Sequence, residues 1–311
     1  MATYNGADYL ACQLDSIRGQ SFQDWELLIR DDGSTDGTAD IIDRFCRQDK
    51  RIKRVDHAGA KHQGPRGNFG RLLARALDST AGLFMFCDQD DYWYPNKVAT
   101  FFDHAHGIGG PCLLYSDIEL VDAQLAPLES TFSFANVLRA GSHETLSGLL
   151  SLNHIPGCCM AINRKLAMFA SPVPDVAIMH DWWLALAAAA YGKITYIDKK
   201  LIKYRQHAGN AVGAAPLWLG VLDAGHWPAL WRKGSKALCG TMRQAGALAV
   251  RLGDKNDADP EPLAALTLYA GIATAGPFKR LETANRLKLR KGRGVLRAVL
   301  YLRLLFLRCG S

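Results

Sequence analysis

Short apolar runs and segments of helical periodicity alternate through the first third of the chain, and this alternation constrains the fold more than any other feature. In chain order, they are helical spacing at 7–18, a run at 25–29, helical spacing at 38–45, a run at 52–55, helical spacing at 69–77 and a run at 83–87. Strands that alternate with helices build βαβ units, whose strands pair in parallel. We therefore expect an α/β fold with an open, mainly parallel sheet flanked by helices.

The same signals continue to about residue 212 and then stop. Four more strands and one apolar helix are expected, in the order 112–115, 158–162, 181–191 (the helix), 194–197 and 201–204. Residues 216–275 are rich in Ala and Leu and helical in character, with a turn-rich break at 254–262. The predicted division is an α/β domain at 1–212, a helical extension at 213–278 and a tail at 279–311.

Most of the positive charge lies in the tail. The chain carries a formal net charge of +7, but 279–308 alone has ten Lys and Arg against the single acid Glu282, so this segment carries +9 and the remainder −2. A basic tail can meet nucleic acid or an anionic membrane. Because the body is negative and has no nucleic-acid-binding motif, we expect no nucleic-acid partner.

On a helical projection of 286–308, the arginines gather on one face and the leucines lie elsewhere. The arginines that share the face are Arg286, Arg290, Arg293, Arg297 and Arg308. A basic face on an otherwise apolar helix is typical of a segment that lies in a membrane interface. The alternative is a helix packed on the body with solvated arginines.

The eight cysteines form no CxxC pair, and Cys158 and Cys159 are adjacent, which suits neither a disulfide framework nor a zinc site. The N-terminus has neither a basic region nor an apolar core of the kind found in secretory signals. No run of 18 or more apolar residues occurs, so no conventional transmembrane helix is expected. Reduced thiols are the expectation for such a chain.

An acidic turn, Asp31-Asp32-Gly33-Ser34-Thr35-Asp36-Gly37, directly follows the apolar run at 25–29. In open α/β sheets, ligands bind outside the carboxyl ends of the strands. Asp, Gly and Ser are also ordinary turn residues, and Ser or Thr can cap the following helix. The turn alone therefore indicates either a ligand loop or a solvated connection.

A second acidic turn, Asp88-Gln89-Asp90-Asp91, directly follows the apolar run 83–87. Three carboxylates in four residues repel one another unless a cation joins them. Hard divalent cations take oxygen ligands, and Mg²⁺ commonly combines one or two carboxylates with substrate phosphates. The turn favours a nucleotide diphosphate held through a metal, and the alternative is an acidic loop at a helix start.

A third feature, His180-Asp181-Trp182-Trp183, opens the apolar helix at 181–191. An acid beside aromatic residues can be a general base with a shifted pKa in a sugar site. The alternative is an acidic residue that interacts with the helix dipole, followed by two core tryptophans.

Taken together, the motifs resemble those of a family 2 glycosyltransferase with the GT-A nucleotide-sugar fold. The resemblance rests on Ala2-Thr3-Tyr4-Asn5-Gly6, then DDGSTDGT at 31–38, then DQDDYWYPNK at 88–97, in the family's order and spacing. It covers about residues 1–210. The string HDWWLALAAAAYGKITYID and the following 204–210, YRQHAGN, are similar to the bacterial rhamnosyltransferase branch. The absence of a QxxRW string implies transfer of single sugars.

The resemblance implies roles for residues at the nucleotide. Thr3, Tyr4 and Asp32 would bind the nucleotide, with Tyr4 and Asp32 at the base, and Asp90 would lie at the ribose. A loop at 64–68 lies close to the nucleotide in the family. It implies that Arg66 or Asn68 touches phosphate or base, with a plain turn and helix cap as the alternative.

The resemblance also implies the reacting groups. Asp91 would ligate a Mg²⁺ or Mn²⁺ ion that bridges the diphosphate, with Asp88 in support, and Asp181 would be the catalytic base. Arg205 and His207 would lie near the diphosphate or the acceptor. A metal that neutralises the leaving nucleotide and a base that deprotonates the acceptor fit a single inverting displacement through an oxocarbenium-like transition state.

The expected activity is therefore inverting, metal-dependent transfer of a sugar, by our best prediction L-rhamnose from dTDP-rhamnose. The acceptor would be a glycan or lipid-linked glycan in bacterial surface polysaccharide assembly, such as O-antigen, capsule or exopolysaccharide. The alternatives are transfer from a UDP-hexose or UDP-N-acetylhexosamine, and a non-catalytic relative that binds a nucleotide or glycan. Because such acceptors often sit on lipid carriers, we expect a cytoplasmic protein held peripherally on the inner membrane.

In the family, a short apolar strand runs directly into the residues that match Ala2–Gly6. Here the sequence starts at Met1, so the first strand of the sheet is expected to be incomplete and the natural chain to carry several more apolar residues upstream.

Overall fold

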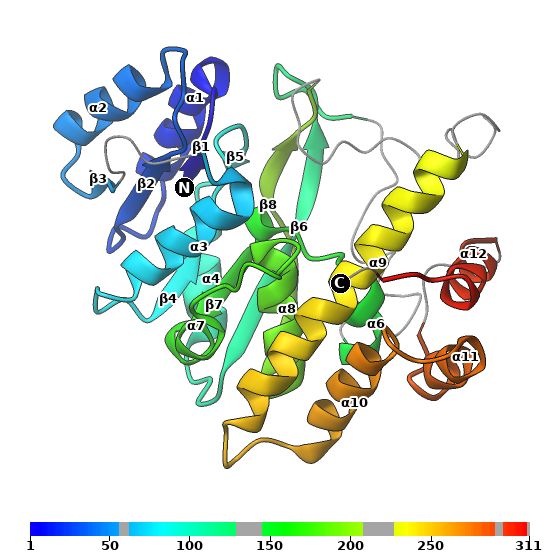
Figure 1. Ribbon diagram of the computed structural model, residues 1–311. Coiled ribbons are helices and arrows are strands. Elements are labelled where there is room, and N and C mark those ends of the chain that lie inside the picture. The colour runs from blue at the N-terminus through cyan, green and yellow to red at the C-terminus, as the bar shows by residue number, and fades with distance from the viewer. Residues whose placement is uncertain (56–61, 129–144, 208–226, 290–294, 310–311) are drawn as a thin grey trace.

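A computed structural model describes residues 1–55, 62–128, 145–207, 227–289 and 295–309. Its first layer is a sheet of three short parallel strands in the order β1-β2-β3, at Ala2–Thr3, Leu27–Asp31 and Ile52–Arg54. Helices α1 (Ala7–Arg18) and α2 (Thr38–Gln48) connect these strands (Figure 1). Each helix buries apolar residues at helical spacing, as the sequence pattern predicts.

The second sheet has five strands in the order β4-β7-β6-β8-β5. They are β4 at Leu83–Met85, β5 at Tyr92–Trp93, β6 at Cys112–Val121, β7 at Met160–Asn163 and β8 at Lys193–Arg205. The pairing is mixed, because β6 and β8 are parallel whereas β4–β7, β6–β7 and β5–β8 are antiparallel. The expectation of a mainly parallel sheet is therefore wrong for this half. An apolar run indicates that a strand is buried, but it does not indicate the direction in which the strand runs.

The strands predicted at 194–197 and 201–204 are one strand, β8. Its middle residues, Asp198, Lys199 and Lys200, are exposed and polar, and the register against β6 shifts between Ser116 and Glu119. The polar residues lie at an irregularity within one continuous strand. The sequence pattern had suggested a break between two strands at this place.

Helices α3, α4, α6, α7 and α8 accompany the strands, at Gly64–Ala76, Lys97–Ala105, Leu146–Ser151, Arg164–Ala170 and His180–Tyr191. Between α6 and β7 lies a single 3-10 turn, Gly157–Cys159. Helix α8 is buried along most of its length, since its small alanines allow the sheet and other helices to approach closely. The first turn of α8 lies beside the 3-10 turn, since Asp181 Oδ2 accepts from the Gly157 N–H at 3.2 Å.

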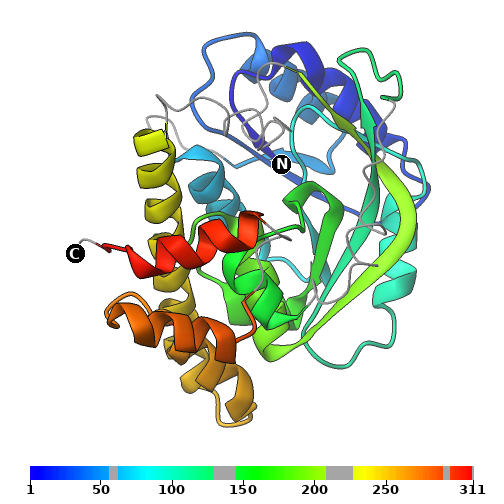
Figure 2. The same ribbon diagram turned by 90° about the vertical axis from the view of Figure 1, so that its right-hand side faces the viewer.

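The C-terminal helices form an outer layer. Helix α9 (Trp227–Gly253) contacts α8 and α6, and α10 (Pro260–Gly271) runs beside α9. Helices α11 (Pro277–Arg286) and α12 (Val295–Leu305) contact each other at the far side of α9 (Figures 1 and 2). No helix in the described ranges is long and apolar enough to cross a membrane.

The tail packs on the body through its leucines. Leu300, Leu304 and Leu307 are buried, Ser147 on α6 donates from its hydroxyl to the Leu287 carbonyl oxygen, and the Arg303 guanidinium lies 5.4 Å over the Trp231 ring on α9. Within the tail, the buried Arg280 guanidinium donates to the carbonyl oxygens of Leu304 at 3.2 Å and Leu307 at 2.6 Å. Packing of the tail on the body is the alternative that the sequence left open. Of the predicted arginine face, Arg286 and Arg308 are exposed, whereas Arg290, Arg293 and the side chain of Arg297 lie outside the described residues.

A disulfide joins Cys239 on α9 to Cys309 after α12, so the expectation that all thiols are reduced is wrong for this pair. The two cysteines lie 70 residues apart, and no local spacing could have paired them. The other six cysteines are free.

Candidate active site

Two loops interlock where β1 and β2 end. The side chain of Asn5 accepts from the Thr35 backbone N–H at 2.8 Å, and Ser34 Oγ accepts from the Asn5 N–H at 2.8 Å. Asn5 has φ of 46° and Gly33 has φ of 90°, backbone conformations that Asn and Gly tolerate best. The motifs at 2–6 and 31–37 therefore fold as one unit at the carboxyl edge of the sheet.

At this edge, Tyr4 offers an aromatic face. Its side chain is 48% exposed, and its ring lies 4.6 Å from that of His62. Thr3 below it is buried and donates to Asp31 Oδ1 at 2.9 Å. Tyr4 is thus available to a flat ligand, whereas the Thr3 hydroxyl is committed to holding the Asp31 loop.

Asp32 is buried and surrounded by donors. The Arg30 guanidinium donates to Oδ1 at 2.9 Å, and the backbone N–H groups of Gln63 and Gly64 donate to its oxygens at 2.8–3.0 Å. His62 Nδ1 lies 3.0 Å from Oδ2. Asp32 therefore ties the 62–64 segment to the end of β2, next to Tyr4.

Gln89 links this first loop unit to the second acidic turn. Its Oε1 accepts from the Tyr4 N–H at 2.8 Å, and its Nε2 donates to the Tyr4 carbonyl oxygen at 3.0 Å. The sequence reasoning gave this residue no role, although it stands inside the DQDD string. The amide pair brings the two motifs to the same edge.

The second turn carries carboxylates that lack comparable partners. Asp91 is 1% exposed, its Oδ1 accepts a long 3.4 Å hydrogen bond from the Arg205 N–H, and its Oδ2 has no partner within the described chain. Loss of solvation, together with the charge of Asp88, raises the pKa of Asp91 well above its ordinary value. Loss of solvation followed by the charge of Asp90 raises the pKa of Asp88 to about 7.

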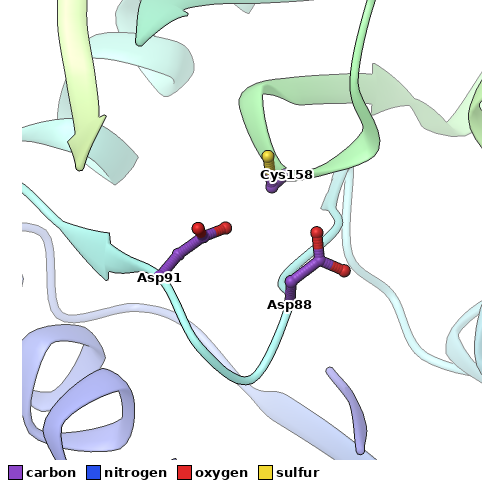
Figure 3. Close-up of side chains that lie close together, drawn as sticks. All are labelled: Asp88, Asp91 and Cys158. Atoms are coloured by element: carbon purple, nitrogen blue, oxygen red, sulfur yellow. The ribbon is translucent and has the colours of Figure 1, made fainter. Parts of the chain in front are cut away.

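Figure 3 shows Asp88, Asp91 and Cys158 facing one another from two segments of the chain. Their ligand atoms all lie within 4.8 Å of one another. An orphaned buried carboxylate oxygen beside a second carboxylate is costly without a positive partner, and a divalent cation would supply one. The residues present therefore fit the metal that the motif implies.

Arg205 and His207 hold the other side of this turn. Arg205 Nε donates to the Asp90 carbonyl oxygen at 2.7 Å, a second nitrogen donates to the Ala123 carbonyl, and the guanidinium lies 4.6 Å over the Tyr9 ring. His207 Nε2 lies 2.8 Å from Asp90 Oδ2. The structure thus brings both predicted residues to the acidic turn, where they orient Asp90.

Asp181 stands at the first turn of α8, across the Gly157–Cys159 turn from the two acids. Its Oδ2 accepts from the Gly157 N–H at 3.2 Å, and its Oδ1 accepts from the Trp182 N–H at 2.6 Å. Loss of solvation raises the pKa of Asp181 to about 6, and its charge contributes to the raised pKa of Asp88. The side chain is thus a carboxylate with the basicity that proton abstraction near neutral pH requires.

Lys97 is a buried cation that the sequence reasoning overlooked. Its Nζ donates to the Cys158 carbonyl oxygen at 2.6 Å and lies 4.0 Å over the Trp93 ring. Burial lowers the pKa of Lys97, whereas the neighbouring thiols and Asp91 raise it. Its place in the DQDDYWYPNK string is the only signal that could have indicated it.

Two predicted residues have other partners. Arg66 donates to the Pro174 carbonyl at 3.1 Å and pairs with Asp175 at 3.0 Å. Asn68 is buried and donates to the Arg30 carbonyl at 3.1 Å. Both thus brace the start of α3, which accords with the plain turn and cap, and contact with the nucleotide stays a prediction.

The sequence profile of the family described as Glycosyl transferase family 2 matches residues 1–168, more than half of the chain. The chain belongs to glycosyl transferase family 2. It is therefore an enzyme of the glycosyltransferase class, as the motifs predict.

Two curated relatives show how far the similarity reaches. The dTDP-rhamnosyl transferase RfbG of Shigella flexneri is 28% identical over 222 residues, which span 69% of this chain and 74% of that protein. The GalNAc(5)-diNAcBac-PP-undecaprenol beta-1,3-glucosyltransferase of Campylobacter jejuni is 32% identical over 117 residues, 36% of each chain.

A solved structure shows the fold. The mannosyltransferase PcManGT from Pyrobaculum calidifontis, in complex with GDP-Man and Mn²⁺, superposes with a TM-score of 0.53 and 19% identity, and it covers 97% of this chain and 77% of that one. Within this family, the expected GT-A fold is thereby confirmed, with a helical C-terminal region.

Proposed function

We propose that this glycosyltransferase moves L-rhamnose from dTDP-rhamnose to an acceptor hydroxyl, in a metal-dependent reaction that inverts the anomeric configuration. The observation that carries the proposal is the position of Asp181, a carboxylate with a pKa of about 6, across one turn from Asp88 and Asp91. A base on one side of the Gly157–Cys159 turn and a diphosphate-binding acid pair on the other would supply the two ends that a direct displacement needs.

The chain's own residues divide the work. Asp88 and Asp91 would hold a divalent cation, which would supply positive charge to the departing nucleotide diphosphate. Tyr4 binds the base with its exposed ring, and Asp32 keeps the 62–64 segment in place beside it. Thr3 supports that loop from below through Asp31.

On the other side, Arg205 and His207 hold Asp90 for the ribose. Asp181 accepts the proton of the acceptor hydroxyl as the hydroxyl oxygen bonds to the anomeric carbon. The bond from that carbon to the diphosphate oxygen breaks at the same time, and the electron pair leaves with the nucleotide. One displacement of this kind inverts the configuration and needs no covalent enzyme intermediate.

The choice of rhamnose follows the name of the Shigella relative and the similarity of 180–210 to the rhamnosyltransferase branch. The second candidate is a UDP-hexose or UDP-N-acetylhexosamine donor, since the Campylobacter relative is named as a glucosyltransferase. Nucleotide release with dTDP-rhamnose, UDP-glucose, UDP-galactose and UDP-GlcNAc decides between them. Turnover with a UDP-sugar alone would replace the rhamnosyl proposal. Absence of turnover with every donor, together with tight nucleotide binding, would support a non-catalytic relative.

We also propose that the acceptor is a glycan, free or on a lipid carrier, in bacterial surface polysaccharide assembly, and that the protein binds the cytoplasmic face of the inner membrane through residues 279–311. Phe278 is 86% exposed and Phe306 is 68% exposed. Pro277, Phe306 and Arg308 line one hollow, which places apolar and basic groups together, and Phe278 directly follows Pro277 in the sequence, just before the tail. Such a combination is typical of surfaces that insert shallowly into anionic bilayers.

Liposome flotation tests this surface. The double variant Phe278→Ser with Phe306→Ser should lose binding to anionic vesicles without loss of thermal stability, because both side chains are exposed. Val250→Ser on α9 is the matched control, since Val250 is 70% exposed outside this surface. Flotation equal to that of the wild type would remove the membrane proposal.

A further inference from the structure

A groove runs between helix α9 and the segment 175–178, which leads into α8. Its volume is about 490 Å³, within the range of about 300–1,000 Å³ that is usual for small-molecule sites. The wall on α9 carries three basic side chains, Lys233, Lys236 and Arg243. Residues three, seven and ten positions apart share one face of an α-helix, so these side chains form a single positive stripe along the groove.

The stripe has no negative partner in the described part of the chain. All three side chains are exposed, and none of them forms an ion pair with another described residue. The acid that lines the groove, Asp175, pairs with Arg66 at 3.0 Å. The groove therefore carries three uncompensated positive charges. One carboxylate would leave two of them, whereas a phosphate or diphosphate supplies more than one negative charge and several acceptor oxygens.

One end of the groove lies close to the carboxylate that we propose as the base. Gln244 Oε1 on α9 accepts from the Ile178 N–H at 3.1 Å, and a Cβ added to Gly240 would lie 3.4 Å from Ile178 Cγ1. Helix α9 and the segment before α8 are therefore in direct contact at this end. Ile178 precedes Asp181 by three residues, which span at most about 11 Å.

The other end of the groove lies beside the tail. Gly234, next to Lys233, faces the Arg303 guanidinium of α12 so closely that no room is left for a side chain. From Lys233 to Arg243 the helix rises by about 15 Å. The groove therefore extends from the segment proposed to bind the membrane to the residues that lead into the proposed base.

We propose that this groove binds the phosphate or diphosphate group that joins the acceptor glycan to a lipid carrier. Lys236 and Arg243 donate hydrogen bonds to its oxygens, the carrier lies toward the tail, and the glycan lies toward Asp181. The inference rests on the acceptor class in the proposed function and deepens it, because it makes the linkage to the carrier a part of what the enzyme recognises. No bond forms or breaks in the groove.

Calorimetric titration of the full chain with inorganic pyrophosphate tests the groove, with EDTA present so that no metal-bound pyrophosphate forms. We expect Lys236→Glu with Arg243→Glu to bind at least about tenfold more weakly than the wild type, because two charge-assisted hydrogen bonds are replaced by repulsion. The matched control is Arg47→Glu with Lys50→Glu, which makes the same change of charge at exposed residues at the end of α2, on the far side of the molecule from α9 (Figure 1).

The control should bind pyrophosphate as the wild type does. Equal affinity in all three proteins, or no binding by the wild type, would overturn the proposal. If the groove variant does not fold, Lys236→Gln with Arg243→Gln removes the donors' charge without adding repulsion, and it should weaken binding in the same direction. Wild-type affinity in this second variant would equally refute the groove.

Flotation on vesicles of phosphatidylglycerol and phosphatidylcholine distinguishes a carrier diphosphate from a phospholipid headgroup. Saturating pyrophosphate should not release the wild type from these vesicles, in comparison with sodium chloride of equal ionic strength, because the membrane contact is assigned to the tail. Release by pyrophosphate would assign the groove to phospholipid headgroups and overturn the proposal. None of these measurements uses sugar transfer, so failure of the rhamnosyl proposal and failure of this one can be told apart.

Discussion

The two acidic turns look alike in sequence and differ in how their charges are satisfied. In the turn at 31–37, Asp32 accepts from a buried guanidinium and two backbone N–H groups, and Asp31 accepts from Thr3 and Ser34. In the turn at 88–91, burial and the charge of Asp90 raise the pKa of Asp88 to about 7, and Asp91 Oδ2 is buried without a partner in the described part of the chain. The protein satisfies the carboxylates of the first turn, whereas in the second turn one oxygen of Asp91 has no hydrogen-bond partner among the described residues.

This difference indicates that the carboxylates of the two acidic turns have different roles. A buried carboxylate with a full set of hydrogen-bond donors stabilises the fold. Its removal leaves those donors buried without an acceptor. A buried carboxylate without donors opposes folding and persists at functional sites. The comparison therefore predicts opposite effects of substitution on stability and activity.

The largest effect is expected for Asp91→Ala. It should abolish transfer and remove the thermal stabilisation that the wild type gains from added divalent cation, because a ligand is lost. The melting temperature without metal should stay equal or rise, since an unpaired buried carboxylate is removed. Activity that survives within about tenfold, with metal dependence intact, would show that the second turn does not hold the metal.

Next in size is Asp181→Asn, which should lower kcat by about 10²–10⁴ and leave donor binding nearly unchanged, because only the proton acceptor is lost. Single-turnover kinetics measure the rate of transfer, and calorimetry measures the affinity for the donor. Weakened donor binding with normal turnover would show that Asp181 supports the structure of the site and does not accept the proton.

Asp32→Ala tests the saturated turn. It leaves the Arg30 guanidinium, 5% exposed, without its carboxylate, so the free energy of unfolding should fall by about 3–5 kcal/mol in chemical denaturation. Asp15→Ala is a suitable control, because the Asp15 side chain is 65% exposed in its pair with Arg18. An unchanged free energy of unfolding in Asp32→Ala would show that the carboxylates of the first turn do not stabilise the fold, contrary to the comparison drawn between the two turns.

The smallest effect concerns pH. Loss of solvation raises the pKa of Asp181 to about 6, so the carboxylate that accepts the proton is present above this value and is lost below it. We expect kcat to be level above about pH 6 and to fall by about tenfold for each pH unit below it. In Asp181→Asn this inflection should disappear, and its persistence would assign the titration to another group.

Much of the site was open to sequence reasoning because each motif is local. The string at 2–6 contains β1, and the strings at 31–37 and 88–97 lie at or just beyond the ends of β2 and β4. Because strand ends gather at one edge of a sheet, the fold class and the acid pair could be predicted. Lys97 was not predicted, because its place in the 88–97 string does not show that the first residue of α4 is buried beside Trp93. Cys158 joins the cluster from a segment 67 residues beyond Asp91, which no spacing indicates.

By itself, then, the order of apolar runs and acidic turns determined the α/β architecture, the family and the carboxylates, since these depend on neighbours within a few residues of the chain. Only the tertiary structure decided which acids are saturated, that β7, β4 and β5 run antiparallel to their neighbours, and that Cys239 pairs with Cys309. It also decided that the tail buries Leu300 and Leu304 against the body. The physical reason is that charge satisfaction, strand direction and burial depend on partners distant in sequence, which meet only when the chain has folded.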